Sequence, residues 1–169
     1  MQPSREPAIL DLLPTDIPAV LALNNAHAVE TSMLDEPGLA ELLNCAFYAR
    51  GIDGGVNGFL LAMDHRAPYA NQNFIWFKKR RSSFVYIDRV IVAESSGGQG
   101  LGTKLYLDLI RAAYDAGHDS LACEVNIDPP NPGSEAFHAA MGFSVIGEAT
   151  IHDGKKQSNI LRNSWDNEQ

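Results

Sequence analysis

The hydrophobic pattern in the first part of the chain predicts one strand followed by a helix. Residues 8–13 are mostly apolar and predict a strand. Apolar residues at helical spacing over 17–23 predict a helix, with Thr15 or Asp16 as its N-cap. The stretch 24–35 is polar and irregular, so we expect a loop there.

A second helix and a β-hairpin are predicted next. Leucines at helical spacing follow Pro37 and indicate a helix over residues 37–43. Two stretches with strand composition, 45–52 and 56–63, flank Asp53-Gly54-Gly55. Asp-Gly is a strong signal for a tight hairpin turn, because such turns need positive φ angles.

The second half carries the clearest periodicity. Residues 84–93 are dense in β-branched and aromatic side chains and predict a central strand. Further elements are expected as a helix over 103–116, a strand over 121–127, a helix over 134–141, and an antiparallel pair, 143–151 with 159–165, around Asp153-Gly154. This order predicts one mixed α/β domain over residues 1–169, and no regular βαβ repeat.

The composition fits a globular domain with an acidic balance. Hydrophobic residues make up 45% and charged residues 20% of the 169, which excludes wholesale disorder and a coiled-coil rod. Lys and Arg number 13 against 21 Asp and Glu, a formal net charge of −8. Because affinity for nucleic acid comes mainly from Lys and Arg, we expect no nucleic-acid partner.

Cysteine usage and apolar runs indicate a reduced compartment. Cys45 and Cys123 are too few and too far apart for a disulfide framework, and Cys123 alternates in phase with neighbouring core residues. No apolar run approaches the roughly 20 residues of a membrane span, and the first residues do not resemble a leader. We therefore expect a cytoplasmic protein with no membrane partner. The histidines lack metal-ligand spacing, so we also expect no metal.

A basic run, Lys78-Lys79-Arg80-Arg81, follows the apolar patch 74–77. It suits either a nucleic-acid contact or the solvated C-terminal end of a short helix, where the helix dipole favours cations. The run has only four residues in an acidic chain, which favours the helix end.

The glycine-rich turn before residue 103 is the most informative segment. Glycines at 97, 98, 100 and 102 let backbone N–H groups converge, and a helix N-terminus follows, so the turn is suited to hold a phosphate. A nucleotide P-loop is excluded because Thr103 precedes Lys104, the reverse of its Lys-Ser/Thr order. The glycine spacing also departs from the G-x-G-x-x-G of dinucleotide-binding folds.

Several segments in this order together resemble the GNAT superfamily of acetyl-CoA-dependent N-acetyltransferases. They are the strand Val90-Ile91-Val92, the glycine turn with its helix, and Asn131 ahead of the stretch 136–143. The family's pyrophosphate turn reads [QR]-x-x-G-x-[GA], and this chain departs from it at the first position, Gly97. The resemblance covers residues 84–151 and implies a mixed, mostly antiparallel sheet flanked by helices, with splayed central strands.

The resemblance implies that acetyl-CoA is the cosubstrate. In the family, main chain at the positions of Val90, Ile91 and Val92 pairs with the pantetheine arm like an added strand. Asn131 matches an asparagine that contacts this arm, and Phe137 joins the cofactor-binding set. The pyrophosphate would lie on the turn residues Gly97, Gly98, Gln99, Gly100, Leu101, Gly102 and Thr103.

The catalytic candidates are chosen by their positions relative to the family's motifs and to the predicted strand faces. His138 falls where the family commonly places a tyrosine that protonates the departing sulfur, and otherwise it is a histidine on a helix surface. Asp88 shares a strand face with Val90, so it is a candidate base for the amine, or the partner of an ion pair with Arg89. Glu124 is the next base candidate, and a mechanism without a base stays open.

The acceptor is expected to be a small-molecule or peptide amine. In this fold the acceptor site would be lined by segments that contain Asn24, Asn25, His27, Tyr69 and Trp76. The leading hypothesis is acetyl transfer from acetyl-CoA to a primary amine by direct attack. The alternatives are a catalytically idle acyl-CoA-binding or sensory domain and a nucleotide- or nucleic-acid-binding module. Edge-exposed terminal strands are compatible with a homodimer.

Overall fold

The computed structural model describes residues 7–27, 31–127, 130–150 and 156–163. Its internal contacts divide the chain into two compact units, one formed by residues 1–63 and 88–112 and the other by 64–87 and 113–169. Strand β4 (Val85–Val92) contributes residues to both. The seven-stranded sheet has the order β1-β2-β3-β4-β5-β7-β6 and is mostly antiparallel, as predicted.

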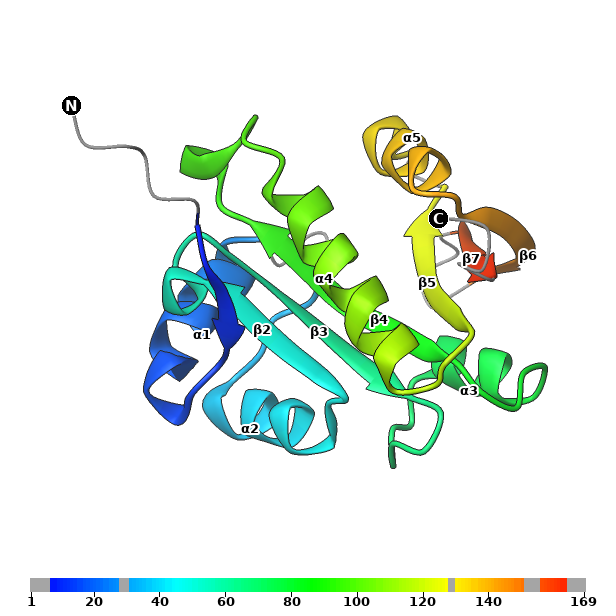
Figure 1. Ribbon diagram of the computed structural model, residues 1–169, viewed down its shortest axis with the longest axis horizontal. Coiled ribbons are helices and arrows are strands. Elements are labelled where there is room, and N and C mark those ends of the chain that lie inside the picture. Colours follow the sequence, from blue (N-terminus) through cyan, green and yellow to red (C-terminus); the bar gives the residue numbers. More distant parts are fainter. Residues whose placement is uncertain (1–6, 28–30, 128–129, 151–155, 164–169) are drawn as a thin grey trace. The chain divides into compact units, whose positions relative to one another are not determined.

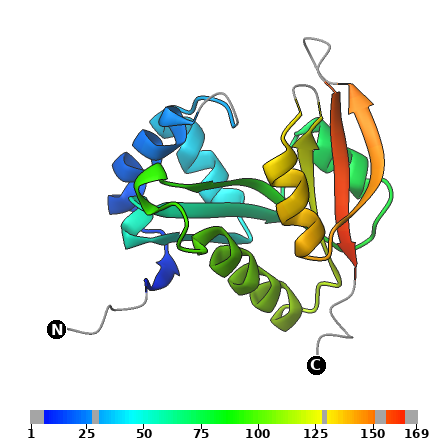
Figure 2. The ribbon, with the colours of Figure 1, turned by 90° about the horizontal axis from the view of Figure 1, so that it is seen from above.

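In the first unit, helices cover both faces of the strands. The strands β1 (Ile9–Asp11), β2 (Tyr48–Ile52) and β3 (Gly58–Asp64) pair antiparallel in this order. Helices α1 (Ile17–Ala26) and α2 (Glu36–Cys45) lie on one face and α4 (Leu101–Asp115) on the other (Figures 1 and 2). The core between α1, α2, β3 and β4 consists of Val20, Leu39, Phe59, Leu61 and Ile91.

The predicted hairpin turn is confirmed. Asp53, Gly54 and Gly55 have φ angles of 52°, 66° and 88°, and they join the antiparallel pair β2 and β3. Three successive residues with positive φ explain why glycine occupies two of the positions.

In the second unit, β4 and β5 (Ser120–Asn126) pair in parallel at Val85–Leu121 and Tyr86–Ala122. Strand β7 (Lys156–Asn163) pairs antiparallel with both β5 and β6 (Ser144–Thr150). Helices α3 (Gln72–Lys78) and α5 (Pro132–Ala140) lie on opposite sides of β5 and β7 (Figure 2).

Two contacts fix these helices on the second unit's strands. The ring of Trp76 in α3 lies so close to Gly147 of β6 that a Cβ there would be 2.6 Å from it. On the other side, Arg162 of β7 donates from Nε to the carbonyl of Met141, the residue that caps α5, at 2.7 Å. Each helix thus has its own face of the β5-β7-β6 strands.

Several predicted boundaries needed correction. Residues 24–26 belong to α1 and not to a loop, and Cys45 ends α2 and does not begin a strand. In both places helical continuity with tertiary packing outweighs local polarity or β-propensity. The turn expected at Asp153-Gly154 lies outside the described residues, although the strands on either side of it pair antiparallel as predicted.

The basic run at 78–81 begins at the end of α3, as the helix-end interpretation predicts. Arg80 stacks on the Trp76 ring, with 3.8 Å from Cζ to the ring centroid, and donates to the Trp76 carbonyl at 3.0 Å. At least one cation of the run is thus engaged by the protein itself. Within the described residues, no helix is long and apolar enough to cross a bilayer.

Candidate functional site

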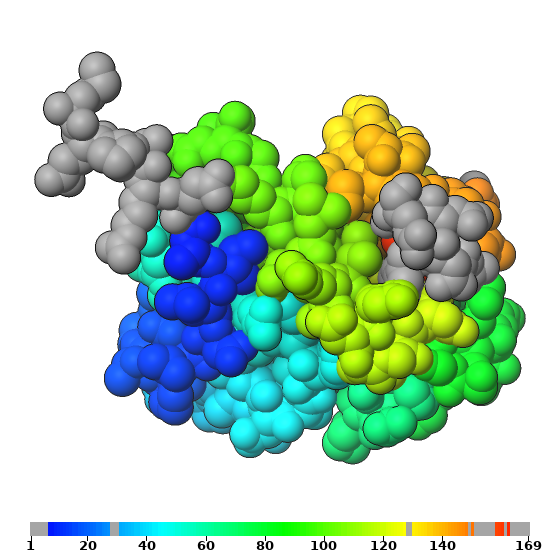
Figure 3. Space-filling view, viewed as in Figure 1, coloured from blue at the N-terminus to red at the C-terminus, as the bar shows by residue number. Residues whose placement is uncertain are grey.

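The turn between β4 and α4 offers an open cradle of backbone. Gly98 and Gly100 have φ angles of 79° and 69°, and a Cβ at either would meet no atom within 4 Å. Residues 97–100 are exposed, and the segment leading into α4 lies at the molecular surface (Figure 3). Since α4 begins at Leu101, its first N–H groups have no partner within the helix. Such an arrangement binds phosphate oxygens.

Asn57 holds the start of this turn, a role that its sequence position did not reveal. Its carbonyl accepts from the amide of Ala93 at 3.1 Å, and its side-chain oxygen accepts from Ser96 Oγ at 3.0 Å. Its side-chain amide donates to Asp53 in the hairpin turn. Ala93 and Ser96 are 36 and 39 positions from Asn57, so only the fold brings them to it, whereas Asp53 is close in the sequence.

Gly97 does not need to be glycine for its backbone. It has φ −62° and ψ 150°, a conformation open to any residue. A Cβ there would lie 3.2 Å from the carbonyl oxygen of Glu94, which requires a small local adjustment. The backbone would therefore accept the Gln or Arg that the family carries here, and its conformation does not explain the glycine.

The C-terminal half of β4 packs tightly against β3 within the first unit. A Cβ at Gly58 would lie 3.1 Å from the carbonyl oxygen of Ile91, so the two backbones approach closely. Ile91 is buried, and Val90 and Val92 are half-buried. The pairs described between β4 and β5 are those at Val85 and Tyr86, which precede these three residues.

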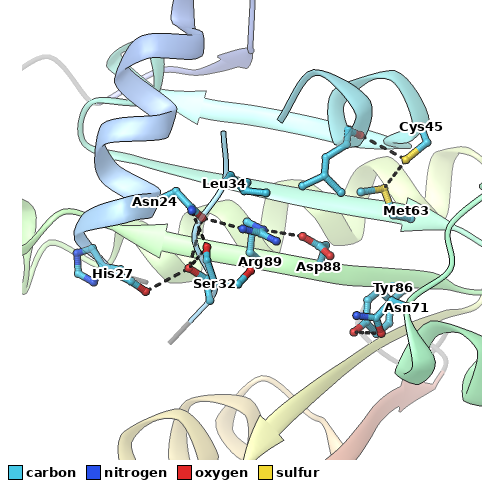
Figure 4. Close-up of polar contacts among 12 residues, drawn as sticks. Asn24, His27, Ser32, Leu34, Cys45, Met63, Asn71, Tyr86, Asp88 and Arg89 are labelled. Atoms are coloured by element: carbon cyan, nitrogen blue, oxygen red, sulfur yellow. Dashed lines mark hydrogen bonds and ion pairs between the residues drawn. The ribbon is translucent and has the colours of Figure 1, made fainter. Parts of the chain in front are cut away.

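Asp88 is engaged in a buried ion pair. Its side chain is 4% exposed and accepts from Nε of Arg89, itself 8% exposed, at 2.6 Å. Arg89 also donates from Nη1 to Oδ1 of Asn24 at 2.8 Å, and Asn24 Nδ2 donates to the carbonyl of Ser32 at 2.8 Å (Figure 4). The geometry shows the ion pair that the sequence left open as an alternative.

The end of α1 also fixes the segment that follows it. Asn25 accepts from the amide of Leu34 and donates to its carbonyl, both at 3.0 Å. Together with Asn24, it ties residues 32–34 to α1. Both asparagines expected at an acceptor site, Asn24 and Asn25, thus have a role in ordering this segment.

His138 lies inside the second unit and not on a helix surface. It is 6% exposed, and its ring meets those of Phe137 and Phe143 edge-on, with centroids 5.4 and 5.2 Å away. Its Nδ1 is 2.7 Å from the carbonyl of Ser134, which assigns the proton to Nδ1 in the neutral ring. Burial lowers the pKa of His138 below the usual 6.5, and the hydrogen bond to Ser134 partly offsets this.

Asn131 begins the same helix. Its Oδ1 accepts from the amide of Ser134 at 3.2 Å and caps α5, followed by Pro132 in the first turn. Asn131, Phe137 and His138 are therefore carried by one short element. Glu124, on β5 of the same unit, accepts from the hydroxyl of Tyr86.

Cys123 is a core residue, as predicted. It is 3% exposed, and burial raises the pKa of its thiol well above the usual 9.0. It is therefore not a nucleophile at neutral pH. Among the residues that the structure describes, no three His, Cys, Asp or Glu side chains are grouped to bind a metal ion.

A sequence model of the acetyltransferase (GNAT) family matches residues 25–143, more than half of the chain. The chain belongs to the GNAT acetyltransferase family. The match runs through both units and includes β4, the glycine turn and α5. Members of this family bind acetyl-CoA, and the family assigns this chain to the acyltransferases.

Solved structures of GNAT proteins share the fold at low sequence identity. Ard1 from Thermoplasma volcanium aligns with a TM-score of 0.73 and 18% identity over 94% of this chain and 98% of its own. The ribosomal-protein-S18-alanine N-acetyltransferase from Escherichia coli gives 0.69 and 18% over 93% of each chain. A GNAT superfamily phosphinothricin acetyltransferase from Sinorhizobium meliloti, solved with AcCoA, gives 0.71 and 16% over 95% and 89%. No curated protein sequence matches the chain significantly.

The predicted site residues of this GNAT protein fall into two groups. One is carried by the first unit and comprises Asp88, Val90–Val92, the turn 97–100 and residues 101–103, which the structure places in the first turn of α4. The other is carried by α5 in the second unit and comprises Asn131, Phe137 and His138. The sequence offered Arg89 as a partner of Asp88, but it did not reveal Asn24 or Asn57, whose contacts with Arg89 and Ser96 are made only by folding.

Proposed function

We propose that this protein is an N-acetyltransferase that moves the acetyl group of acetyl-CoA to a primary amine by direct attack. The observation that carries the proposal is the open glycine cradle before α4 in a chain of the GNAT family. Two structurally similar proteins carry the name N-acetyltransferase, and the name of one of them specifies an alanine of a ribosomal protein. These names support an amine acceptor.

The residues present fit acetyl-CoA. The backbone at Gly98 and Gly100 is open to a phosphate. Backbone N–H groups can hold a phosphate without a basic patch, so the net charge of −8 does not exclude an anionic cofactor. We assign the pyrophosphate to the turn residues 97–103 and the pantetheine arm to the main chain of Val90, Ile91 and Val92. Asn131 and Phe137 on α5 complete the proposed cofactor-binding set.

The reaction forms a C–N bond and breaks a C–S bond, so the amine must lose a proton and the sulfur must gain one. We propose that His138 gives its proton to the sulfur. This role needs the imidazolium, which burial disfavours, so kcat should fall as pH rises through a pKa below 6.5. A kcat that rises through this pKa would instead make His138 a proton acceptor.

We propose Asp88 as the group that receives the proton of the amine. Its pairing with Arg89 holds the carboxylate in place. Asp88→Asn should therefore lower kcat and leave the acetyl-CoA dissociation constant within about twofold. An unchanged kcat would mean that water or Glu124 receives the proton of the amine instead.

Calorimetry with acetyl-CoA and turnover over a panel of amines test the proposal together. Micromolar or tighter binding, with acetylation of at least one amine that His138→Ala slows, supports it. Absence of acetyl-CoA binding overturns it. Binding without turnover of any amine would favour an idle acyl-CoA-binding or sensory domain.

Gly97 offers a sharper test of the cradle. Gly97→Arg restores the side chain that the family carries there, in a backbone conformation that accepts it. Acetyl-CoA should bind several-fold tighter, because a charge-assisted hydrogen bond to phosphate is added. Gly97→Leu is the matched control without a donor, and equal affinities for both variants would place the phosphates elsewhere.

We also propose that the protein works in the cytoplasm, which the two free cysteines support. A homodimer stays a proposal as well. The edge strand β6 exposes Val145 and Ile146, and sedimentation velocity would measure the oligomeric state directly.

A further inference from the structure

Asn159 of β7 is completely buried, yet neither its amide oxygen nor its amide nitrogen has a hydrogen-bond partner among the described residues. Buried polar groups in folded proteins are almost always paired, because an unpaired group gives up hydration and gains nothing in return. An amide of this kind in the middle of a sheet indicates that a partner from outside the protein belongs there.

The register of the strands shows which residues surround this amide. Asn159 stands opposite Glu124 of β5 on one side and opposite Gly147 of β6 on the other. Directly opposed residues of antiparallel strands project from the same face, with Cβ atoms about 4.5–5.5 Å apart. Trp76 of α3 lies over Gly147, so α3 covers this face of the second unit.

Glu124 and Asn159 are therefore polar neighbours without a hydrogen bond between them. Glu124 accepts from the hydroxyl of Tyr86, a fully buried residue whose ring lies against Phe74 and Phe77 with centroids 5.9 and 6.1 Å away. Glu124 itself is only half-buried, so solvent reaches the group. A carboxylate oriented by a tyrosine hydroxyl beside aromatic rings is a binding group for a cation.

We propose that Glu124 and Asn159 form a subsite for the acceptor amine, and that this subsite selects amines with a carbonyl on the adjacent carbon. The arriving ammonium donates to Glu124 and to Oδ1 of Asn159 before it loses its proton. Nδ2 of Asn159 then donates to the carbonyl oxygen. Amino acids, amino amides and peptide N-termini carry both groups, whereas a plain alkylamine carries only the first. This inference rests on the proposed N-acetyltransferase function and narrows its substrate class.

Two small primary amines, glycinamide with a carbonyl on the adjacent carbon and propylamine without one, test the selection. The ratio of their kcat/KM values is measured for the wild type and for Asn159→Leu, within the wider amine panel. The difference in pKa between the two amines is the same for both enzymes, so it cancels when the two ratios are compared. We expect glycinamide to lose about tenfold relative to propylamine in Asn159→Leu, because the buried donor to its carbonyl oxygen is removed. The lost acceptor for the ammonium affects both amines alike.

Ser158→Ala is the matched control, since Ser158 is buried next to Asn159 on the opposite face of β7. It should leave the ratio unchanged. Glu124→Gln should raise KM for every amine and leave the acetyl-CoA dissociation constant as it is. If Asn159→Leu does not fold, Asn159→Ala serves for the same ratio.

The outcomes separate this inference from the proposed function. Absence of turnover with all amines overturns the proposed function. Equal ratios in wild type and the Asn159 variant overturn the subsite alone, as does turnover of other amines with none of glycinamide. A tenfold loss confined to the Asn159 variants, with acetyl-CoA affinity retained, supports it.

Discussion

The two units each contain a buried polar cluster, and the two clusters are completed in different ways. In the first unit, Asp88, Arg89 and Asn24 satisfy one another and end on the carbonyl of Ser32. In the second, Tyr86 and Glu124 pair, but Asn159 stands beside them with both amide atoms unpartnered. Both clusters contain an acid, a donor and a buried asparagine.

The difference teaches how a buried polar group can be assigned a role. A cluster that the protein completes by itself contributes to the fold, because removing any member leaves a charge or a dipole unpaired. A cluster that the protein leaves incomplete weakens the fold and is retained where a ligand completes it. The free energy of unfolding should therefore fall when Arg89 is replaced, and stay the same or rise when Asn159 is replaced.

Arg89→Met should have the largest effect on stability. It leaves the Asp88 carboxylate buried without its cation, which costs about 3–5 kcal/mol in the free energy of unfolding. Urea denaturation measures this value. The double variant Asp88→Asn/Arg89→Met should recover most of the loss, since no charge is then left unpaired. A loss below about 1 kcal/mol in the single variant would mean that water reaches the pair.

Asn25→Ala should cost less, about 1–2 kcal/mol, because it removes two hydrogen bonds to the backbone of Leu34. The segment 31–34 should at the same time lose protection, which hydrogen exchange at the Leu34 amide would record. Asn44→Ala on the exposed face of α2 is the control, and it should change neither quantity. A Leu34 amide that exchanges equally slowly in the variant would contradict the role of Asn25.

Asn159→Leu should not lower the free energy of unfolding, in contrast to the two preceding variants. Replacing an unpartnered buried amide by an apolar group of similar size should leave the free energy of unfolding unchanged or raise it by about 1 kcal/mol. The thermal midpoint in the absence of any amine is the simplest measurement. A clear drop would show that Asn159 supports the fold, and the contrast between the two clusters would then fail.

The smallest effect is expected from the pH dependence of stability. Burial lowers the pKa of His138 and of His118 below 6.5, so as the pH falls the unfolded chain binds protons first. The stabilising contribution of each is present above about pH 6.5 and is lost as the pH falls toward the pKa in the folded state. Urea denaturation at pH 7 and pH 5 should show this loss, and His138→Leu should reduce it while the share of His118 stays. An unchanged pH dependence in His138→Leu would show that water reaches this imidazole.

Local features of the sequence were sufficient to predict most of the elements. The β-branched run of β4, the Asp-Gly turn after β2 and the glycines before α4 each act through the conformational preferences of a few neighbouring residues. These preferences are the same whether or not the rest of the chain is folded. The boundaries at residues 24–26 and 45 were wrong because packing, and not local preference, sets them.

The family and the glycine cradle were also within reach of the sequence, because they depend on residue types at short, fixed spacings. The environment of each catalytic candidate was not. The sequence offered Arg89 as a partner of Asp88, but the bond from Arg89 to Asn24, 65 residues away, needs the fold. The burial of His138 against Phe143 and the opposition of Glu124 and Asn159 need it as well. Burial and hydrogen-bond partners set the charge state of an acid or an imidazole and decide whether an amide is paired, and only the tertiary structure supplies them.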